Sequence, residues 1–445
     1  MHMTPVSDVR ISDAGSTRGS AYIENNKILM ACGSLHVAWL DAGRGGMEGV
    51  RIRTLDLQHG RWAAAVTLGE ADDNHGGPTI VRDGSGYLHV LFGPHGNPLS
   101  YRRSLRPDDA SAWTPVERFG LRCTYPSMVC DSANTLHMVC RDSSTPGWTL
   151  MYYRRKAGGA WSDGRPLIES TLKDNTYRCY RASLFLDASD VLHLGFMLFG
   201  GQAFKDAQTK GLAGYLRSAD AGKTWTDAEG ARVEPLPTDT GFDRIPVKDN
   251  CIRTGNLVVA ADGVPCTVTV STGFRGYHAK WGEATLWMRG ADGWQALSLN
   301  PYIEAVYPGY RASWAEPSLS ITDDGRLFVA LTVVDARSVD PRDAGTSGQH
   351  CGRPKSIFGN ASSRLALLIS DDGGHTFSAQ RVGKDVANVP SWIPSLERVT
   401  GHNQLAMPHL LYTHGDTGQG CNPKDIATEI RLVSFGTALP DSELP

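Results

Sequence analysis

Two histidines flank one predicted β-hairpin and bring two imidazoles to the same edge. His75 precedes the apolar run Pro78–Arg82, and His95 follows the run Tyr87–Phe92. The residues between these runs, Asp83–Gly86, have the Asp-Gly-Ser-Gly composition of a tight turn. Because the start of the first strand and the end of the second meet at one end of an antiparallel hairpin, both rings are expected there. Imidazoles at such an edge can accept or donate protons near neutral pH.

A tyrosine and an arginine occupy the equivalent positions around the next predicted hairpin. Tyr125 stands just before the strand that starts at Ser127, and Arg141 stands just after Val139. A guanidinium can bind a carboxylate or sulfate through two hydrogen bonds, and neighbouring cations favour the phenolate of a tyrosine. These residue types therefore combine anion binding with proton transfer.

An internal repeat supplies the elements that must position these residues. The unit is a strand, a turn with Gly, Asp or Asn, and a second strand that often contains Leu-His; two further candidate strands follow it. Four strands repeated seven times predict an all-β chain, a seven-bladed β-propeller of four-stranded antiparallel blades that forms one domain over residues 1–445. The seven copies cover residues 27–40, 79–92, 127–139, 183–196, 256–270, 318–331 and 395–411.

The ends of the chain and two turn motifs support the same fold. The last repeat lacks an outer strand after Ile430–Phe435, and Val6–Ser12 could supply it, so that the N-terminal strand closes the ring. Ser218–Trp225 and Ser370–Phe377 match the S-x-D-x-G-x-x-W/F Asp box of sialidase-like propellers. The aspartate of such a box can bond turn amides, so its expected role is structural and says little of activity.

Other residues are expected beside the first four if the innermost strand of every blade runs from the top face to the bottom. Residues just before the first strand or just after the second would then cluster around the axis at the top. That face would be rich in His, Tyr and Arg and poor in acids, which suits an anionic ligand. The candidate ligand-binding residues are Tyr177, Arg178, Tyr180, Arg181, Asn250, Arg253, Trp314, Glu316, Trp392 and His414.

Histidines in the middle of second strands have a different expected role. His36, His89, His137 and His193 fall where one blade packs on its neighbour. They are predicted to be structural, with one ring nitrogen bonded to the backbone. A structural alternative also applies to His75 and His95, which could merely bond the Gly-Pro loops around them.

Composition limits the partners. The chain of 445 residues is 41% hydrophobic and 20% charged, with a formal net charge of -3, so a basic surface for nucleic acid is not expected. No run of about 18 apolar residues is present, so no membrane-spanning helix is expected. The segment Met1–Arg10 lacks the regions of a signal peptide, which leaves the compartment open. A monomer is expected.

Three residues are candidate metal ligands. Cys251, Cys266 and His278 lie in or beside the fifth repeat and are residue types that zinc accepts. None of them has the tight spacing of a strong zinc motif, and the nine cysteines are scattered, which favours buried thiols. A structural zinc or calcium ion stays open, and no cofactor is expected for catalysis.

The run Asn74–Ser104, with Thr124–Cys130 after it, resembles the BNR-4 group of propellers, which includes the ulvan lyases of polysaccharide lyase families 24 and 25. In those enzymes two histidines, a tyrosine and an arginine line a central canyon. His75, His95, Tyr125 and Arg141 match them one by one, and the likeness is best over residues 73–155. The resemblance implies a secreted or periplasmic lyase that cleaves an anionic, ulvan-like glycan of rhamnose and uronate.

The chemistry that the resemblance implies is β-elimination at a uronic acid. Arg141 would neutralise the carboxylate, Tyr125 would remove the C5 proton, His95 or Tyr125 would protonate the leaving oxygen, and His75 would hold the carboxylate or the sugar ring. Three alternatives stay open. They are an exo-acting lyase that removes rhamnose from glucuronate, a sialidase-like glycoside hydrolase and a non-catalytic carbohydrate-binding propeller.

Overall fold

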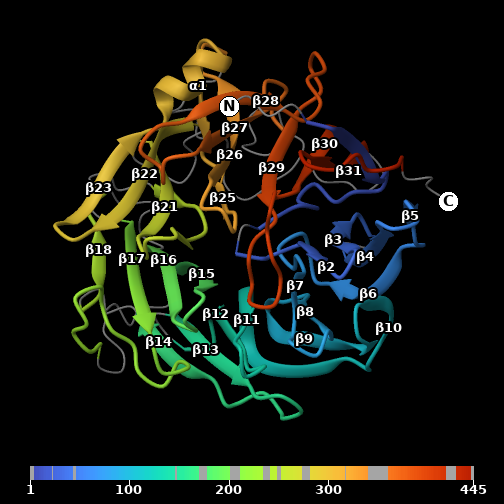
Figure 1. The fold of residues 1–445 in the computed structure, drawn as a ribbon, viewed down its shortest axis with the longest axis vertical. Coiled ribbons are helices and arrows are strands. Elements are labelled where there is room, and N and C mark those ends of the chain that lie inside the picture. Colours follow the sequence, from blue (N-terminus) through green and yellow to red (C-terminus); the bar gives the residue numbers. More distant parts are fainter. Residues whose placement is uncertain are drawn as a thin grey trace.

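The computed structural model describes residues 5–22, 24–43, 47–145, 148–169, 178–200, 211–233, 241–247, 252–272, 281–315, 317–338, 359–416 and 427–441. Strands dominate this part of the chain, and its one α-helix is the short α1 (Asn300–Val306). The predicted all-β class is therefore confirmed. In Figure 1 the strands follow the chain once around a common centre.

The second sheet along the chain contains His95, Tyr125 and Arg141, and His75 lies in the loop before its first strand. A five-stranded sheet precedes an eight-stranded sheet in which β9 pairs with both β8 and β11. The five strands are β2 (Ile28–Ala31), β3 (Ser34–Asp41), β4 (Glu48–Asp56), β5 (Arg61–Trp62) and β6 (Val66–Ala71). The eight are β7 (Thr79–Arg82), β8 (Leu88–Phe92), β9 (His95–Arg106), β10 (Asp109–Trp113), β11 (Glu117–Cys130), β12 (Leu136–Asp142), β13 (Thr149–Arg155) and β14 (Arg165–Glu169).

The next two sheets contain four and ten strands, and the pairing of β22 with β24 makes the second of them continuous. The four-stranded sheet consists of β15 (Arg178–Leu186), β16 (Leu192–Gly200), β17 (Leu212–Ser218) and β18 (Asp243–Ile245). The ten-stranded sheet consists of β19 (Ile252–Thr254), β20 (Val258–Val259), β21 (Pro265–Ser271), β22 (Trp281–Gly290), β23 (Gly293–Ser298), β24 (Tyr310–Ser313), β25 (Ser318–Ile321), β26 (Leu327–Asp335), β27 (Arg364–Ser370) and β28 (Ser378–Val382).

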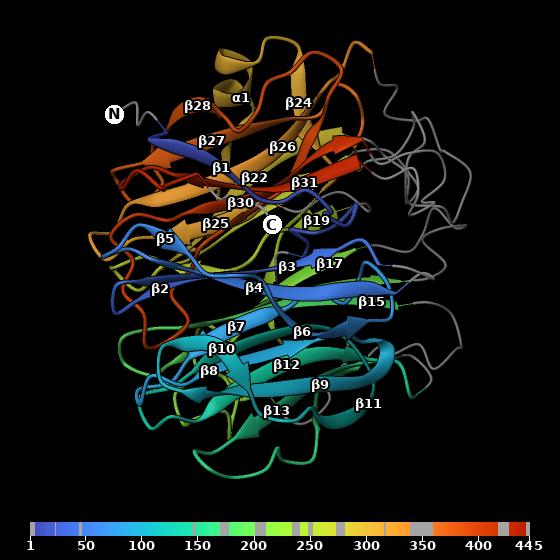
Figure 2. The ribbon, with the colours of Figure 1, turned by 90° about the vertical axis from the view of Figure 1, so that its right-hand side faces the viewer.

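The last sheet joins the two ends of the chain. Its order is β1-β31-β30-β29, and the N-terminal β1 runs antiparallel to β31 with Val9 opposite Leu432 (Figure 2). The predicted addition of the N-terminal strand to the last sheet is confirmed by this pairing. The strands are β1 (Ser7–Ser12), β29 (Ser391–Leu396), β30 (Leu410–Asp416) and β31 (Ala427–Ser434).

A repeated polar contact holds three of the mid-strand histidines inside the core. His89 Nε2 lies 3.1 Å from Asp83 Oδ2 in the preceding turn, and its Nδ1 lies 2.7 Å from the hydroxyl of Tyr101 on the next strand. His137 and His193 repeat the pattern. The structural prediction is correct, but the partners are side chains and not backbone, because each imidazole spans from its turn to the adjacent strand. His36 bonds Thr54 Oγ1 instead.

Both Asp boxes form the predicted turns. In the first, Asp220 Oδ1 accepts a hydrogen bond from Thr224 N at 2.8 Å, and Gly222 N donates to Ser218 Oγ at 3.0 Å. Trp225 is buried beneath the turn. Asp372 repeats the bond with the backbone N–H of Thr376. These motifs stabilise turns after third strands and contribute no side chain to the site below.

No helix in the described ranges has the length and apolar character needed to cross a membrane.

Candidate active site

The hairpin of β7 and β8 brings His75 and His95 together as predicted. Thr79 pairs with Leu91, so the chain before β7 and the chain after β8 leave the hairpin at the same end. The two imidazoles stack with centroids 4.0 Å apart and planes inclined by 22°. His75 is half-buried and His95 is exposed.

Asp73 holds both rings. Its Oδ1 lies 2.9 Å from Nδ1 of His75, and its Oδ2 lies 2.6 Å from Nδ1 of His95. Burial alone would raise the pKa of the Asp73 carboxyl, but the hydrogen bonds from the two histidines outweigh that effect and lower it. An ionised Asp73 therefore accepts a hydrogen bond from each Nδ1–H and fixes how both rings are oriented.

Arg18 determines which nitrogen of His75 carries the ring proton. The guanidinium Nη1 lies 2.8 Å from Nε2 of His75. An arginine can only donate, so Nε2 must accept, and the ring proton must be on Nδ1 facing Asp73. Burial and then the charge of Arg18 lower the pKa of His75 well below its usual value. His75 is therefore neutral, with both nitrogens occupied.

His95 differs from its neighbour in one decisive way. Its Nδ1 is bonded to Asp73, but its Nε2 has no hydrogen-bond partner within the described part of the chain. About a third of its side chain is accessible to solvent. The Nε2 of His95 is thus the imidazole nitrogen of the pair that can exchange a proton with a bound ligand.

Tyr125 is presented by an irregular point in β11. Its φ is +60°, in the left-handed region that non-glycine residues rarely adopt, and the register between β11 and β12 shifts between Thr124 and Ser127. This break turns the side chain toward the rings of the hairpin. The centroid of Tyr125 lies 6.2 Å from that of His75, and the tyrosine is almost fully buried.

Two guanidiniums approach the ring of Tyr125. Arg141, opposite Thr124 in the β11–β12 ladder, has its Cζ 4.8 Å from the ring centroid and donates to Thr124 Oγ1 at 3.1 Å. Arg181 on β15 has its Cζ at the same distance of 4.8 Å. Nearby positive charge stabilises a phenolate relative to the neutral phenol. The structure therefore brings all four predicted catalytic residues into one group.

The segment before β2 adds Arg18 and Tyr22 to the site, and no sequence motif indicated them. Tyr22 packs edge-on to Tyr125 at 5.1 Å between centroids and stacks on His75 at 5.7 Å, while Arg18 donates to its hydroxyl. Arg181 lies 4.4 Å above its ring and forms a buried ion pair with Glu24. This segment precedes the first repeat and matches no motif. The one available signal was a run of polar residues between two predicted strands.

Glu48 on β4 adds a titratable group near this cluster. Burial raises the pKa of its carboxyl to about 7, a hydrogen bond from Ser16 opposes the rise, and the charge of Asp73 adds to it. The charge of Arg18 also lowers the pKa. The carboxyl of Glu48 therefore changes charge in the physiological range.

Most of the remaining predicted ligand-binding residues that the structure describes are buried. Arg253 covers the ring of Trp314 at 4.2 Å, and both side chains are buried, as is Trp392. His414 is also buried and its Nδ1 lies 3.0 Å from Ser391 Oγ. Tyr180 belongs to a core cluster with Leu184 and Leu194, so it is not brought to the rings as Arg181 is. Tyr177, Asn250, Glu316 and the side chain of Arg178 lie outside the described residues.

The zinc candidates receive little structural support. Cys266 is buried in the core, and burial raises the pKa of its thiol to about 12, which disfavours the thiolate that a metal requires. Cys251 and His278 lie outside the described residues. Among the described residues, Asp73, His75 and His95 do present three possible ligand atoms within 4.8 Å of one another. The Arg18 guanidinium beside His75 opposes a cation there.

The sequence matches a known family over more than half of its length. A model described as the BNR repeat-containing family matches residues 34–291. A curated protein of Pseudoalteromonas sp. (strain PLSV), named "Ulvan Lyase-PL25", is 32% identical over 107 residues, which cover 18% of this chain and 22% of that protein. The chain thus spans about a fifth of the length of the curated relative it matches.

Solved structures share the fold across nearly the whole chain. A PL25 ulvan lyase has a TM-score of 0.65 at 14% identity, with 96% of this chain and 95% of that chain covered. The same TM-score, at 13% identity, is found for a PL25 ulvan lyase bound to a fragment written GlcA(1-4)Rha3S, with 96% and 95% of the two chains covered. The polysaccharide lyase Uly1 has a TM-score of 0.58 at 13% identity, with 97% and 99% covered.

Proposed function

We propose that this protein, which belongs to the BNR repeat-containing family, is a polysaccharide lyase that cleaves an anionic glycan of rhamnose and uronate by β-elimination. The observation that carries the proposal is the group formed by Tyr125, the two guanidiniums at its ring and the histidine pair bonded to Asp73. It combines a basic oxygen, positive charge and an accessible imidazole in one place. The ulvan lyase named among its relatives supports the substrate class.

The first step requires a stronger acid at C5 of the uronate. The hydrogen on C5 is only weakly acidic while the neighbouring carboxylate carries its full negative charge. Arg141 pairs with that carboxylate, and the Tyr125 phenolate removes the C5 proton. The electrons of the broken C–H bond form the C4=C5 double bond as the C4–O bond breaks. Arg181 supports the phenolate from β15.

The second proton goes to the leaving oxygen. His95 is the acid in this proposal, because about a third of its side chain is accessible to solvent while Asp73 holds its Nδ1. Asp73 also stabilises the imidazolium before the proton is transferred. His75, with Arg18 on one nitrogen and Asp73 on the other, positions the carboxylate that orients His95. No step needs a bound metal or cofactor.

We also propose that the sheets form seven four-stranded blades in a single domain. Two pairings, β9 with β11 and β22 with β24, join neighbouring groups of strands into longer sheets. Separation of the sheets at these two pairings leaves seven groups that follow the seven sequence repeats. The irregular register of the β9–β11 pairing supports a junction between blades at that position.

The substrate implies where the protein acts. A sulfated or uronate polymer does not cross a membrane, so we place the enzyme outside the cytoplasm, acting as a monomer on a soluble or gel-like polysaccharide.

The test is an assay with purified rhamnose–uronate polysaccharide. The unsaturated product absorbs ultraviolet light, whereas hydrolysis releases reducing ends without that absorbance. The proposal expects new absorbance and new reducing ends to rise together. Release of reducing ends alone would assign a hydrolase, and binding without either signal would assign a carbohydrate-binding propeller.

A further inference from the structure

A second cavity lies at the other ends of the strands that carry the candidate active site. The strand β9 starts at His95 and reaches Arg103 near its far end, where the cavity opens. Its volume is about 410 Å³, within the range of sites that hold a small ligand. Its lining includes Ser85, Tyr87, Arg103, Asn134, Arg155 and Lys156.

Positive charge is in excess in this cavity. The guanidinium Cζ of Arg103 lies 4.4 Å from the ring centroid of Tyr87, and no acidic side chain in the described ranges pairs with Arg103 or with Lys156. Arg155 differs, because its Nη1 donates to both carboxylate oxygens of Glu117 at 2.8 and 2.7 Å. The remaining acid, Asp83, is bonded to His89, whose pKa burial lowers, so Asp83 keeps its negative charge and the lining has three cations against two acids. Two of the three cations are therefore available to an anion.

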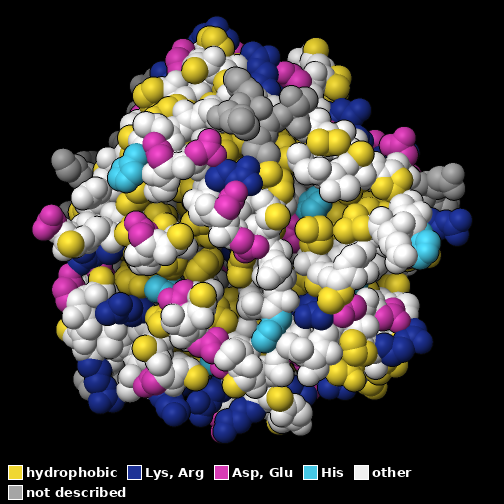
Figure 3. All heavy atoms as spheres, viewed as in Figure 1, with side chains coloured by type: hydrophobic (Ala, Val, Ile, Leu, Met, Phe, Trp, Pro, Cys, Tyr) yellow, Lys and Arg dark blue, Asp and Glu magenta, His cyan; other side chains and the backbone are white. Residues whose placement is uncertain are grey.

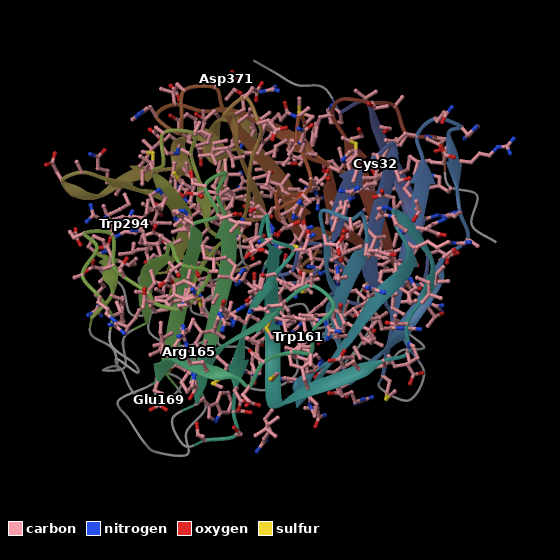
Figure 4. All side chains as sticks on the ribbon, turned by 60° about the horizontal axis from the view of Figure 1, so that its bottom comes forward. Cys32, Trp161, Arg165, Glu169, Trp294 and Asp371 are labelled. Carbon is pink, nitrogen blue, oxygen red and sulfur yellow. The ribbon has the colours of Figure 1, made fainter. Side chains whose placement is uncertain are left out.

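The walls of the cavity are held by strands. Tyr101 on β9 is buried, with the guanidinium of Arg155 4.6 Å from its ring centroid. Trp161 packs edge-on to Tyr101 at 5.5 Å and stacks on Phe119 at 4.4 Å; Figure 4 shows its position beside the teal and green strands. On the face seen in Figure 3, Lys and Arg side chains gather along the lower edge of the molecule. The cavity is thus preorganised.

We propose that this cavity binds a carboxylated or sulfated sugar unit of a polysaccharide, as a site separate from the candidate active site. Arg103 and Lys156 bind the acid group, since a guanidinium fixed on an aromatic face offers two parallel donors to a carboxylate or sulfate. Tyr87 provides a ring at the rim, and Ser85 and Asn134 provide polar groups for sugar hydroxyls. The choice of a sugar as ligand rests on the proposed function, whereas the choice of an anion rests on the cavity alone.

Affinity electrophoresis tests the site without requiring any turnover. Native gels contain hyaluronan, which has only carboxylates, dextran sulfate, which has only sulfates, or neutral dextran. All variants carry Tyr125→Phe so that a substrate stays intact. The variant Arg103→Gln/Lys156→Gln is compared with Arg61→Gln/Lys223→Gln, which removes the same charge from exposed residues elsewhere. Thermal melting of each variant checks that it is folded.

The expected result is retardation by at least one anionic polymer but not by dextran. Arg103→Gln/Lys156→Gln should raise the apparent Kd by about tenfold or more, while Arg61→Gln/Lys223→Gln should leave it unchanged. Equal retardation of the two folded variants would overturn the proposal. The lyase proposal is judged separately by product absorbance, so either can fail while the other stands.

Discussion

The rings of His75 and His95 stack with their centroids 4.0 Å apart, although one residue precedes a β-hairpin and the other follows it. Two imidazolium ions at this distance would repel each other strongly. Burial, and then the charge of Arg18, lower the pKa of His75 and keep it neutral, and the ionised Asp73 contacts both rings. The pair therefore has unequal members: both nitrogens of His75 are bonded, whereas His95 is exposed and its Nε2 has no hydrogen-bond partner among the described residues.

Removal of the charge of Asp73 should disable both rings. Asp73→Asn presents an amide where an acceptor is needed, so at least one histidine loses its orientation and the tautomer that leaves Nε2 of His95 available. We expect kcat on rhamnose–uronate polysaccharide to fall by about 100-fold or more. The exposed Asp163→Asn is a matched control with unchanged rates. Normal kcat in Asp73→Asn would remove the carboxylate from the mechanism.

Substitution of the two histidines should have different effects. His95→Gln removes the proton donor and should lower kcat by about 1,000-fold, with loss of one limb of the pH–rate profile. His75→Gln removes a positioning contact and should cost about 10- to 100-fold while that limb remains. Steady-state kinetics across pH distinguishes them. If His75→Gln also abolished the limb, the assignment of the acid to His95 would be wrong.

Tyr125→Phe should separate chemistry from packing. The phenylalanine ring keeps its contacts with Tyr22 and both guanidiniums, so the melting temperature should stay close to that of the original protein. Turnover should fall by about 1,000-fold or more because the base is lost. Tyr302→Phe, on α1, serves as the control with full activity. A near-normal rate in Tyr125→Phe would exclude the phenolate as base.

Arg141 should be sensitive in both activity and stability. Its side chain is only 2% exposed, and its guanidinium lies 4.7 Å from the ring centroid of Trp148 as well as beside Tyr125. Arg141→Ala should abolish turnover and lower the free energy of unfolding by about 1 to 3 kcal/mol, as measured in urea. Arg141→Lys retains the charge but not the two parallel donors. We expect that variant to recover most of the stability and little of the activity.

Glu48 should contribute a pH-dependent loss of stability. Its pKa is raised to about 7 in the folded state, above its unfolded value, so the folded protein binds more protons than the unfolded chain between the two. The stabilisation that the protonated Glu48 contributes is therefore fully present below its unfolded-state pKa and is lost as the pH rises through about 7. Glu48→Gln should be more stable than the original protein by on the order of 2 kcal/mol at pH 8 and by much less at pH 5.

The measurement for Glu48 is the difference between the two melting temperatures as a function of pH. Both proteins contain the buried histidines, so the difference between their melting temperatures removes the contribution of those residues. His36 is one of them, and its lowered pKa of about 4 makes stability rise with pH. A difference that does not change between pH 5 and 8 would show that the Glu48 carboxyl has its ordinary pKa.

The sequence alone determined the all-β class, the hairpin that pairs His75 with His95, and the return of the N-terminal strand to the last sheet. These follow from local rules, namely strand periodicity, turn residues and a repeat that leaves one strand missing. Tyr125 and Arg141 could be identified for the same reason, since they occupy equivalent positions around the next hairpin.

Only the tertiary structure decided which residues surround these four. Arg18 and Tyr22 reach the site from the segment before β2, and Arg181 points to the rings from β15 while its neighbour Tyr180 packs into the core. Such contacts join residues that are far apart in sequence, and no local pattern specifies them. Alternation along a strand assigns Tyr180 and Arg181 to opposite faces, but which face meets the site depends on how the sheets pack. The tautomer of His75 likewise follows from a guanidinium brought to it by folding.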